Sequence, residues 1–305
     1  MAIGTTGMAS AELVERARAE LDRQFSQPLE PGLYLVATPI GNLADVTLRA
    51  LATLSRADVI LCEDTRHSRV LLQHFGINRP LRAYHEHNAA AERPRILAAL
   101  AEGQTVALIS DAGTPLVSDP GYKLVREASE RGYRVTALPG ASSVLAGLSL
   151  GGLPTDCFLF AGFLPPRESA RRSRLTELAA VPATLVFFEA PSRVAAALAD
   201  IAEVCRGREV AVARELTKRY EEVKRGQAEE LVAWLAAAGE PKGEFVVMVG
   251  PPGKREVSDT DIASRLEQAL PDMSLRDAAR EVAADLGVAR SRVYDIGLRL
   301  KSGSR

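Results

Sequence analysis

The chain has 305 residues, enough for about two domains of ordinary size and a smaller appendage. Hydrophobic residues make up 47% and charged residues 25%, which are globular proportions and exclude disorder over most of the chain. The 38 Lys and Arg residues against 39 Asp and Glu residues give a net charge of −1. This balance excludes a uniformly basic nucleic-acid-binding coat but allows local basic patches.

The cysteine pattern and the hydropathy point to a cytoplasmic protein. Cys62, Cys157 and Cys205 are odd in number and far apart, which argues against a disulfide scaffold or a cysteine zinc site. No apolar run reaches the length of about 18 residues that a membrane span needs. The N-terminus has no apolar signal-peptide core either.

The chain begins with a polar lead-in, residues 1–31, that we expect to lie outside the fold. Leu13, Ala17 and Leu21 are at helical spacing, so part of it is expected to form a short surface helix. From residue 32, apolar runs of strand length alternate with helical patterns, which predicts parallel strands covered by helices. The expected strands are 33–37, 59–62, 106–109 and 135–138, and the expected helices are 48–54, 70–75, 89–101 and 122–131.

Each of these strands ends in a polar or Gly/Pro-rich turn. In open α/β sheets the ligand crevice lies beyond the C-terminal ends of the strands, so the four turns are expected to meet at one site. The turns are 38–42, 63–66, 110–115 and 139–143.

A second domain is expected after residue 150, because Gly151-Gly152-Leu153-Pro154 interrupts the pattern. Its helices and strands alternate less regularly, which predicts a mixed α/β domain over 151–253. The expected strands are 157–160, 184–188, 210–213, 221–225 and 245–249, with helices at 169–180, 193–205 and 228–237.

The last segment, 254–305, has three helical patterns and no strand signal. A helix, the turn Leu286-Gly287-Val288 and another helix form a helix-turn-helix pattern. The expected fold class is therefore α/β, with a first α/β domain over 32–150, a second over 151–253 and a small helical C-terminal segment.

The loop after the third strand, 110–121, is the most informative motif, and two interpretations of it stay open. It could present backbone groups and Asp111 to a polar ligand, or it could be an ordinary turn in which Asp119 caps a helix. The next loop has the same ambiguity, because Ser142 or Ser143 could cap a helix whose N-terminus attracts an anion. A dinucleotide site is disfavoured, because Gly41 stands without the other glycines of a Gly-x-Gly-x-x-Gly loop.

Two further clusters carry titratable side chains. Glu63-Asp64-Thr65-Arg66 is either a solvated turn with a local ion pair or part of a catalytic site. In Tyr84-His85-Glu86-His87-Asn88 the two histidines would share one face of a strand. A zinc site would need a further ligand that the sequence does not identify, so we expect no metal and favour acid–base chemistry or RNA contact.

Three segments run basic on a chain that is nearly neutral overall. Segments 167–174, 206–225 and 276–305 each have a net charge of +3. Each could be a solvated face, and together they could form a localised phosphate-binding surface.

Taken together, these motifs resemble the tetrapyrrole-methylase superfamily of S-adenosylmethionine enzymes, and within it most closely the branch that acts on small-subunit ribosomal RNA. In the first half the resemblance is carried by segments 36–43, 63–66, 85–88, 110–121 and 139–143. In the second half it is carried by Phe187-Phe188-Glu189-Ala190-Pro191-Ser192-Arg193, Ala213-Arg214-Glu215-Leu216-Thr217-Lys218 and Pro241-Lys242-Gly243-Glu244-Phe245. It spans residues 32–252, and the helical C-terminal segment is also typical of that branch.

The resemblance implies two α/β domains with S-adenosylmethionine in the cleft between them, and a homodimer. It also implies methyl transfer to the ribose 2′-hydroxyl of a cytidine in the decoding region of 16S rRNA, within the small ribosomal subunit. Carried over by motif, the cofactor site would comprise Pro39, Gly41, Asp111, Ala112, Gly113, Thr114, Pro115, Ser142, Ser143, Phe187, Phe188, Leu216, Pro241, Lys242 and Gly243.

The 2′-hydroxyl is a poor nucleophile and benefits from a base. Asp64 is our candidate for the proton acceptor and Arg66 for orienting the substrate, with Glu189, His85 and Lys218 as rivals. The candidate RNA contacts are His85, His87, Asn88, Arg167, Arg171, Arg172, Arg193 and Lys218.

Two alternative functions remain open at this point. One is a methyltransferase for tetrapyrrole carbons on the same fold, against which the His-Glu-His-Asn and Phe-Phe-Glu-Ala-Pro motifs and the basic tail favour RNA. The other is a helix-turn-helix binding protein with a small-molecule sensor domain. Against it, such proteins read base edges as dimers, whereas this helical tail follows a large two-domain body.

Overall fold

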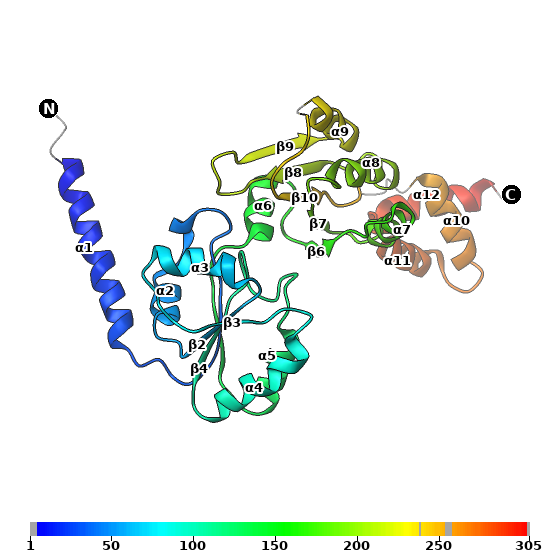
Figure 1. The fold of residues 1–305 in the computed structure, drawn as a ribbon. Helices are drawn as coiled ribbons and strands as arrows, with labels where there is room; N and C mark the ends of the chain where they lie inside the picture. The colour runs from blue at the N-terminus through cyan, green and yellow to red at the C-terminus, as the bar shows by residue number, and fades with distance from the viewer. Residues whose placement is uncertain (1–4, 238, 254–257, 304–305) are drawn as a thin grey trace. The chain divides into compact units, whose positions relative to one another are not determined.

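The computed structural model describes residues 5–237, 239–253 and 258–303. The chain divides into two compact units, Met1–Pro251 and Pro252–Arg305. The larger unit contains two five-stranded sheets, and the smaller unit is helical (Figure 1).

The first sheet is parallel throughout and has the strand order β3-β2-β4-β1-β5. Its strands have nearly unbroken apolar sequences because helices cover both faces. One face packs on α4 and α5 through residues such as Leu33 and Val106, and the other packs on α2 and α3 through Tyr34 and Ile60. The elements are β1 (Gly32–Val36), α2 (Leu48–Leu54), β2 (Val59–Cys62), α3 (Thr65–His74), β3 (Leu81–Ala83), α4 (Ala89–Ala101), β4 (Thr105–Leu108), α5 (Tyr122–Glu130) and β5 (Val135–Leu138), with a short 3₁₀ helix, η1, at Leu43–Asp45.

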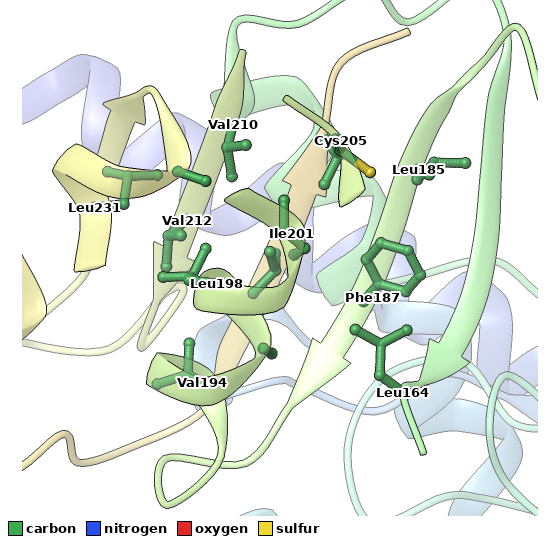
Figure 2. Close-up of a cluster of buried hydrophobic side chains, with 14 of the residues drawn as sticks. Leu164, Leu185, Phe187, Val194, Leu198, Ile201, Cys205, Val210, Val212 and Leu231 are labelled. Atoms are coloured by element: carbon green, nitrogen blue, oxygen red, sulfur yellow. The ribbon is translucent and has the colours of Figure 1, made fainter. Parts of the chain in front are cut away.

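The second sheet is mixed and has the order β6-β7-β10-β8-β9. The pair β6–β7 is parallel and the other pairs are antiparallel. One face is covered by α7, α8 and α9, as the close-up in Figure 2 shows for α8. The elements are β6 (Phe158–Phe163), α7 (Glu168–Ala179), β7 (Thr184–Glu189), α8 (Val194–Val204), β8 (Val210–Arg214), β9 (Glu222–Gly226), α9 (Ala228–Ala237) and β10 (Phe245–Val249).

Helix α6 (Ser143–Gly151) joins the two sheets, because it follows β5 of the first sheet and packs on the second (Figure 1). Two glycines permit this contact. A Cβ on Gly147 would lie 3.0 Å from Val246 Cγ1, and one on Gly151 would lie 2.9 Å from Met248 Sδ. The close packing of α6 sets the C-terminal ends of β1, β4 and β5 against the second sheet.

The N-terminal helix α1 (Thr5–Ser26) is longer than the short helix we expected, at 22 residues. It packs beside α2, and the Arg56 guanidinium donates hydrogen bonds to the carbonyl oxygens of Phe25 and Gln27. Leu13 and Val14 remain exposed. The lead-in is therefore attached to the fold at its end and solvated along most of its described length.

The smaller unit contains three helices in its described part, as the sequence predicted: α10 (Asp259–Ala269), α11 (Leu275–Leu286) and α12 (Arg290–Gly303). They enclose a core that includes Ile262, Val282 and Ile296. The turn between α11 and α12 contains Gly287 with φ of 63°, a left-handed conformation that glycine adopts readily.

Across the described ranges of both units, no helix combines the length and the apolar sequence needed to cross a membrane. The α/β fold class expected from the sequence is confirmed, including the helical C-terminal segment.

Candidate active site

A cavity of about 430 Å³ lies in the larger unit. It lies between the C-terminal ends of strands of the first sheet and the strand ends on one side of the second sheet. This volume is within the range of small-molecule sites. Loops after β1, β4 and β5 form one side, and the ends of β6, β7 and β8 with the start of β10 form the other. The predicted cofactor residues that line it are Asp111, Ala112, Gly113, Thr114, Ser142, Ser143, Phe188, Leu216 and Gly243.

The three loops of the first side are tied together by hydrogen bonds. Thr38 and Gly113 exchange backbone bonds of 2.9 and 3.0 Å, and the Thr114 hydroxyl donates to the Ala141 carbonyl at 3.2 Å. Gly113 has φ of 82°, and a Cβ there would lie 3.2 Å from Ile40 Cγ2. The convergence expected from the turns therefore occurs for these three loops, with a glycine at their crossing point.

The loop after β4 is not an ordinary turn. Leu116 and Ser118 have φ of 72° and 67°, which is costly for residues with a side chain and is common at functional sites. Asp119 was a candidate helix cap, and that interpretation is wrong, because Gly121 occupies the N-cap of α5. Asp119 lines the cavity instead.

Three carboxyl groups from two strand ends lie near one another at this side of the cavity. Burial, together with the charges of Glu63 and Asp111, raises the pKa of Asp119 to about 6. Burial and the charge of Asp111 also raise the pKa of Glu63. One oxygen of Asp111 accepts the backbone N–H of Asp64 at 3.0 Å, which fixes that carboxylate between the second and fourth strands.

Asp64 and Arg66, our first catalytic candidates, do not line the cavity. Asp64 is the N-cap of α3, and its carboxylate accepts the Arg66 backbone N–H at 2.8 Å and pairs with the Arg66 guanidinium at 3.0 Å. Hydrogen bonds from Arg66 hold the pKa of Asp64 below its ordinary value. This geometry argues for a helix cap and against a general base.

We expect Asp64→Asn to leave the rate of single-turnover methyl transfer nearly unchanged. Asn caps helices about as well as Asp, so the variant should also lose little stability. Rapid-quench measurement of methyl transfer and thermal unfolding check this. A loss of rate of 100-fold or more, of the order that general acid–base catalysis contributes, would restore Asp64 as the proton acceptor.

Glu189, the other catalytic candidate, lines the cavity but is engaged by neighbouring groups. It is 3% exposed, accepts the Ala190 backbone N–H at 3.0 Å and forms an ion pair with Arg193 at 3.1 Å. Burial raises the pKa of Glu189, while the Ala190 N–H and Arg193 oppose that rise. Arg193 also donates to the Leu164 carbonyl, so this pair fixes the loops after β6 and β7.

The two neighbouring phenylalanines of β7 point to opposite faces of the sheet, as successive strand residues do. Phe187 is fully buried against α8 and does not contact the cavity, so its assignment to the cofactor site is wrong (Figure 2). Phe188 faces the cavity and packs on Phe160 and Phe163, with ring centroids 4.8 and 5.7 Å away.

The other predicted cofactor residues lie outside the cavity wall: Pro39, Gly41, Pro115, Pro241 and Lys242. Their neighbours Ile40 and Glu244 line it instead. Each of these motifs has at least one residue in the cavity wall, but a turn presents only some of its residues to the cavity, and the sequence does not say which.

Among the RNA candidates, Arg171 is wrongly assigned. It is 5% exposed, its Nε lies 2.6 Å from Asp200 Oδ2, and it donates to the Pro166 carbonyl. A buried, paired guanidinium is not available to a phosphate. Its neighbour Arg172 also pairs with Asp200, at 2.7 Å, but remains half-exposed, and Arg167 is exposed.

The His85-Glu86-His87-Asn88 segment is a turn between β3 and α4 and not a strand. The histidine rings lie 6.0 Å apart. Asn88 accepts the His85 backbone N–H at 2.8 Å and donates to the Ala83 carbonyl at 2.9 Å, so its side chain holds the turn together. His87 is exposed and His85 is half-buried.

Lys218, proposed both for catalysis and for RNA contact, has its ammonium group between two carboxylates. Its Nζ lies 2.9 Å from Glu215 Oε1 and 3.0 Å from Glu244 Oε2. Both partners flank the cavity-lining residues Leu216 and Gly243. The Lys218 ammonium group is therefore neutralised by two carboxylates next to the cavity, and it is not a free charge that could bind a phosphate.

The fold and the cavity define a class of protein with two α/β sheets and a small-molecule site between them. Comparison with known sequences identifies the family. The profile of the family described as Tetrapyrrole (Corrin/Porphyrin) Methylases matches residues 32–232. The chain belongs to this family. The profile described as RsmI C-terminal HTH domain matches residues 256–301.

Close relatives carry one name. A protein of Mesorhizobium japonicum named ribosomal RNA small subunit methyltransferase I is 54% identical over 280 residues, which cover 92% of this chain and 95% of the relative. The protein of that name from Escherichia coli O157:H7 is 45% identical over 269 residues, covering 87% of this chain and 94% of the relative.

Solved structures share the fold at lower identity. Diphthine synthase superposes with a TM-score of 0.57 at 17% identity, covering 72% of this chain and 89% of that one. Cobalt precorrin-4 methyltransferase superposes with a TM-score of 0.52 at 18% identity, covering 72% and 94%.

Proposed function

We propose that this chain is an S-adenosylmethionine-dependent methyltransferase of small-subunit ribosomal RNA, and that it methylates the ribose 2′-hydroxyl of a cytidine in the decoding region of 16S rRNA. The observation that carries the proposal is the cavity, because it joins the loops after β1, β4 and β5 to the second sheet. Relatives named ribosomal RNA small subunit methyltransferase I, 45 to 54% identical over most of the chain, support the substrate class.

The residues of the cavity fit the cofactor. Phe188, Leu216 and Val246 supply apolar wall for a flat heterocycle, while Asp111 and Asp119 supply carboxylates on the other side. A sulfonium ion is positively charged, and carboxylates in a partly buried site attract it. The cofactor supplies an already activated methyl group, so positioning can contribute much of the rate.

We assign the proton of the acceptor hydroxyl to Asp119. The hydroxyl oxygen bonds to the methyl carbon as the carbon–sulfur bond breaks, the electron pair stays on sulfur, and the proton passes to the Asp119 carboxylate. A pKa of about 6 suits this role, since the group is mostly ionised at neutral pH and is still basic enough to accept a proton.

The test is transfer of a tritiated methyl group to small ribosomal subunits, followed by mapping of the modified nucleotide. The proposal requires one 2′-O-methylated cytidine in the decoding region. Labelling of a base, of another nucleotide, or only of a tetrapyrrole acceptor would overturn the assigned substrate.

The helical C-terminal unit is proposed to contact RNA, since Arg276, Arg280 and Arg290 are exposed on it. Truncation at residue 253 should raise the KM for ribosomal subunits more than it changes cofactor affinity. Activity of the full chain should fall steeply with salt, as counterion release predicts, and the truncated chain should show a shallower dependence. Steady-state kinetics at several salt concentrations check this, and unchanged kinetics after truncation would remove the unit from RNA binding.

We also propose that the protein is a cytoplasmic homodimer. Three free cysteines suit a reducing compartment. Strand β6 lies at the edge of the second sheet and exposes Phe158, an apolar surface of the kind that subunit contacts cover. Light scattering gives the mass directly.

A further inference from the structure

The turn between β8 and β9 has an unusual backbone beside the cavity. Glu215 and Thr217 have φ of 52° and 63°, so two residues with side chains adopt left-handed conformations on either side of Leu216. Such backbone angles are unfavourable for residues with a side chain, and the conformation persists only where its surroundings fix it. Leu216 is 6% exposed, and its side chain is part of the cavity wall.

A network of charged groups fixes this turn. Lys218 Nζ bridges Glu215 and Glu244 with contacts of 2.9 and 3.0 Å. Glu215 Oε1 also accepts the Glu244 backbone N–H at 3.1 Å, and the Glu215 backbone N–H donates to the Glu244 carbonyl at 3.0 Å. The network therefore joins the turn to the residue that precedes β10, on the same side of the cavity.

The aliphatic part of Lys218 reaches the other side of the cavity. A Cβ on Gly41 would lie 2.4 Å from Lys218 Cγ and 3.0 Å from Lys218 Cε, so the lysine side chain runs directly over the backbone of the loop after β1. The Leu216 carbonyl is also close, at 3.1 Å from that position. Gly41 is needed here because any side chain would displace the lysine.

We infer that Lys218 is a positioning residue: its ion pairs with Glu215 and Glu244 and its contact with Gly41 hold Leu216 as a closed wall of the cavity, so that it sets cofactor affinity and does not bind RNA. This inference rests on the proposed function, since it takes the ligand to be S-adenosylmethionine. Without the bridge, the strained turn can relax to ordinary backbone angles, and Leu216 leaves the wall.

The test is Lys218→Met, which removes the charge but keeps an unbranched apolar side chain over Gly41. Hydrogen bonds to charged groups contribute enough that we expect the Kd and KM for S-adenosylmethionine to rise about tenfold, mainly through faster dissociation. The kcat at saturating cofactor, the KM for ribosomal subunits and the salt dependence should stay as in the wild type. Lys218→Arg keeps the positive charge and should restore most of the affinity.

Lys224→Met is the matched control, because Lys224 is an exposed lysine on the adjacent strand β9 that does not line the cavity. It should leave cofactor affinity unchanged. Gly41→Ala should weaken cofactor binding by displacing the lysine, and its effect should be much smaller in the Lys218→Met background, since both changes disturb one contact.

Two outcomes would overturn the inference. One is wild-type cofactor affinity in a folded Lys218→Met variant. The other is a higher KM for ribosomal subunits with a shallower salt dependence, which would make Lys218 a phosphate ligand. If the wild type itself binds neither S-adenosylmethionine nor S-adenosylhomocysteine by calorimetry, the proposed function fails and not the role of Lys218 within the turn.

Discussion

Asp119→Asn is expected to slow the methyl-transfer step by roughly 10²–10⁴-fold, the usual contribution of general acid–base catalysis. Asn has nearly the same size but cannot accept the proton of the 2′-hydroxyl, so the loss should persist at saturating cofactor, where a weaker attraction for the sulfonium no longer limits the rate. The measurement is the single-turnover rate on ribosomal subunits at saturating cofactor. A loss confined to KM would mean that Asp119 only positions a substrate.

The pH dependence of kcat/KM for ribosomal subunits and cofactor gives a second, independent result. Asp119 must be ionised to accept a proton, and its pKa is about 6. The wild-type kcat/KM, which reports the pKa of the free enzyme, should therefore rise about tenfold per pH unit below pH 6 and level off above it. Asp64→Asn should keep this profile and Asp119→Asn should lose it. A wild-type profile that is flat between pH 5 and 8 would contradict the assignment.

The ionised Asp119 carboxylate should favour activity but lower the stability of the folded protein. Its pKa in the folded protein lies above its ordinary value of 3.8, so the folded state favours the protonated form. The ionised carboxylate is thus a cost that is absent below about pH 4 and fully present above about pH 6. Asp119→Asn should raise the melting temperature above pH 6, and the gain should disappear toward pH 4.

The arrangement of the first sheet follows directly from the sequence pattern. Apolar runs alternate with helical ones, which requires parallel strands, and parallel strands bring their C-terminal turns to one edge. The pattern therefore predicts that Asp111, Thr114 and Ser142 meet at one site, and all three line the cavity.

The roles of single side chains could not be predicted in this way. Asp119 looked like a helix cap because a local pattern does not reveal that Gly121 begins the helix or that Glu63 is close by. Phe187 and Phe188 are equivalent in a motif, but only the face of the strand decides which one reaches the ligand. Strand alternation could have identified one of the two as buried, though not which one.

Basic residues were the least predictable, because their partners are distant in sequence. Arg171 belongs to a basic run, yet Asp200, which neutralises it, lies 29 residues away on another helix. Lys218 belongs to another run, and Glu244 lies 26 residues away, directly before strand β10. Net charge along a segment therefore overstated the surface available to phosphate.

The pairing of Arg171 with Asp200 leads to the largest expected effect on stability. Both side chains are almost fully buried, at 6% and 3% exposed. Asp200→Ala would leave the Arg171 guanidinium buried without its carboxylate. Removing one partner of a buried pair typically costs about 3–5 kcal/mol, so we expect the urea midpoint for unfolding of the larger unit to fall markedly.

Asp200 also pairs with Arg172, at 2.7 Å. Glu203→Ala is the matched control, because Glu203 pairs with Arg172 too, at 2.8 Å, but is 54% exposed. A solvent-exposed pair contributes at most about 1 kcal/mol, so this variant should unfold close to the wild type. Replacing both buried partners, as Arg171→Met with Asp200→Leu, removes the unpaired charge and should recover much of the lost stability. If Asp200→Ala and Glu203→Ala cost the same, the guanidinium has found water or another acceptor, and Arg171 is then close enough to the surface to be reconsidered as an RNA contact.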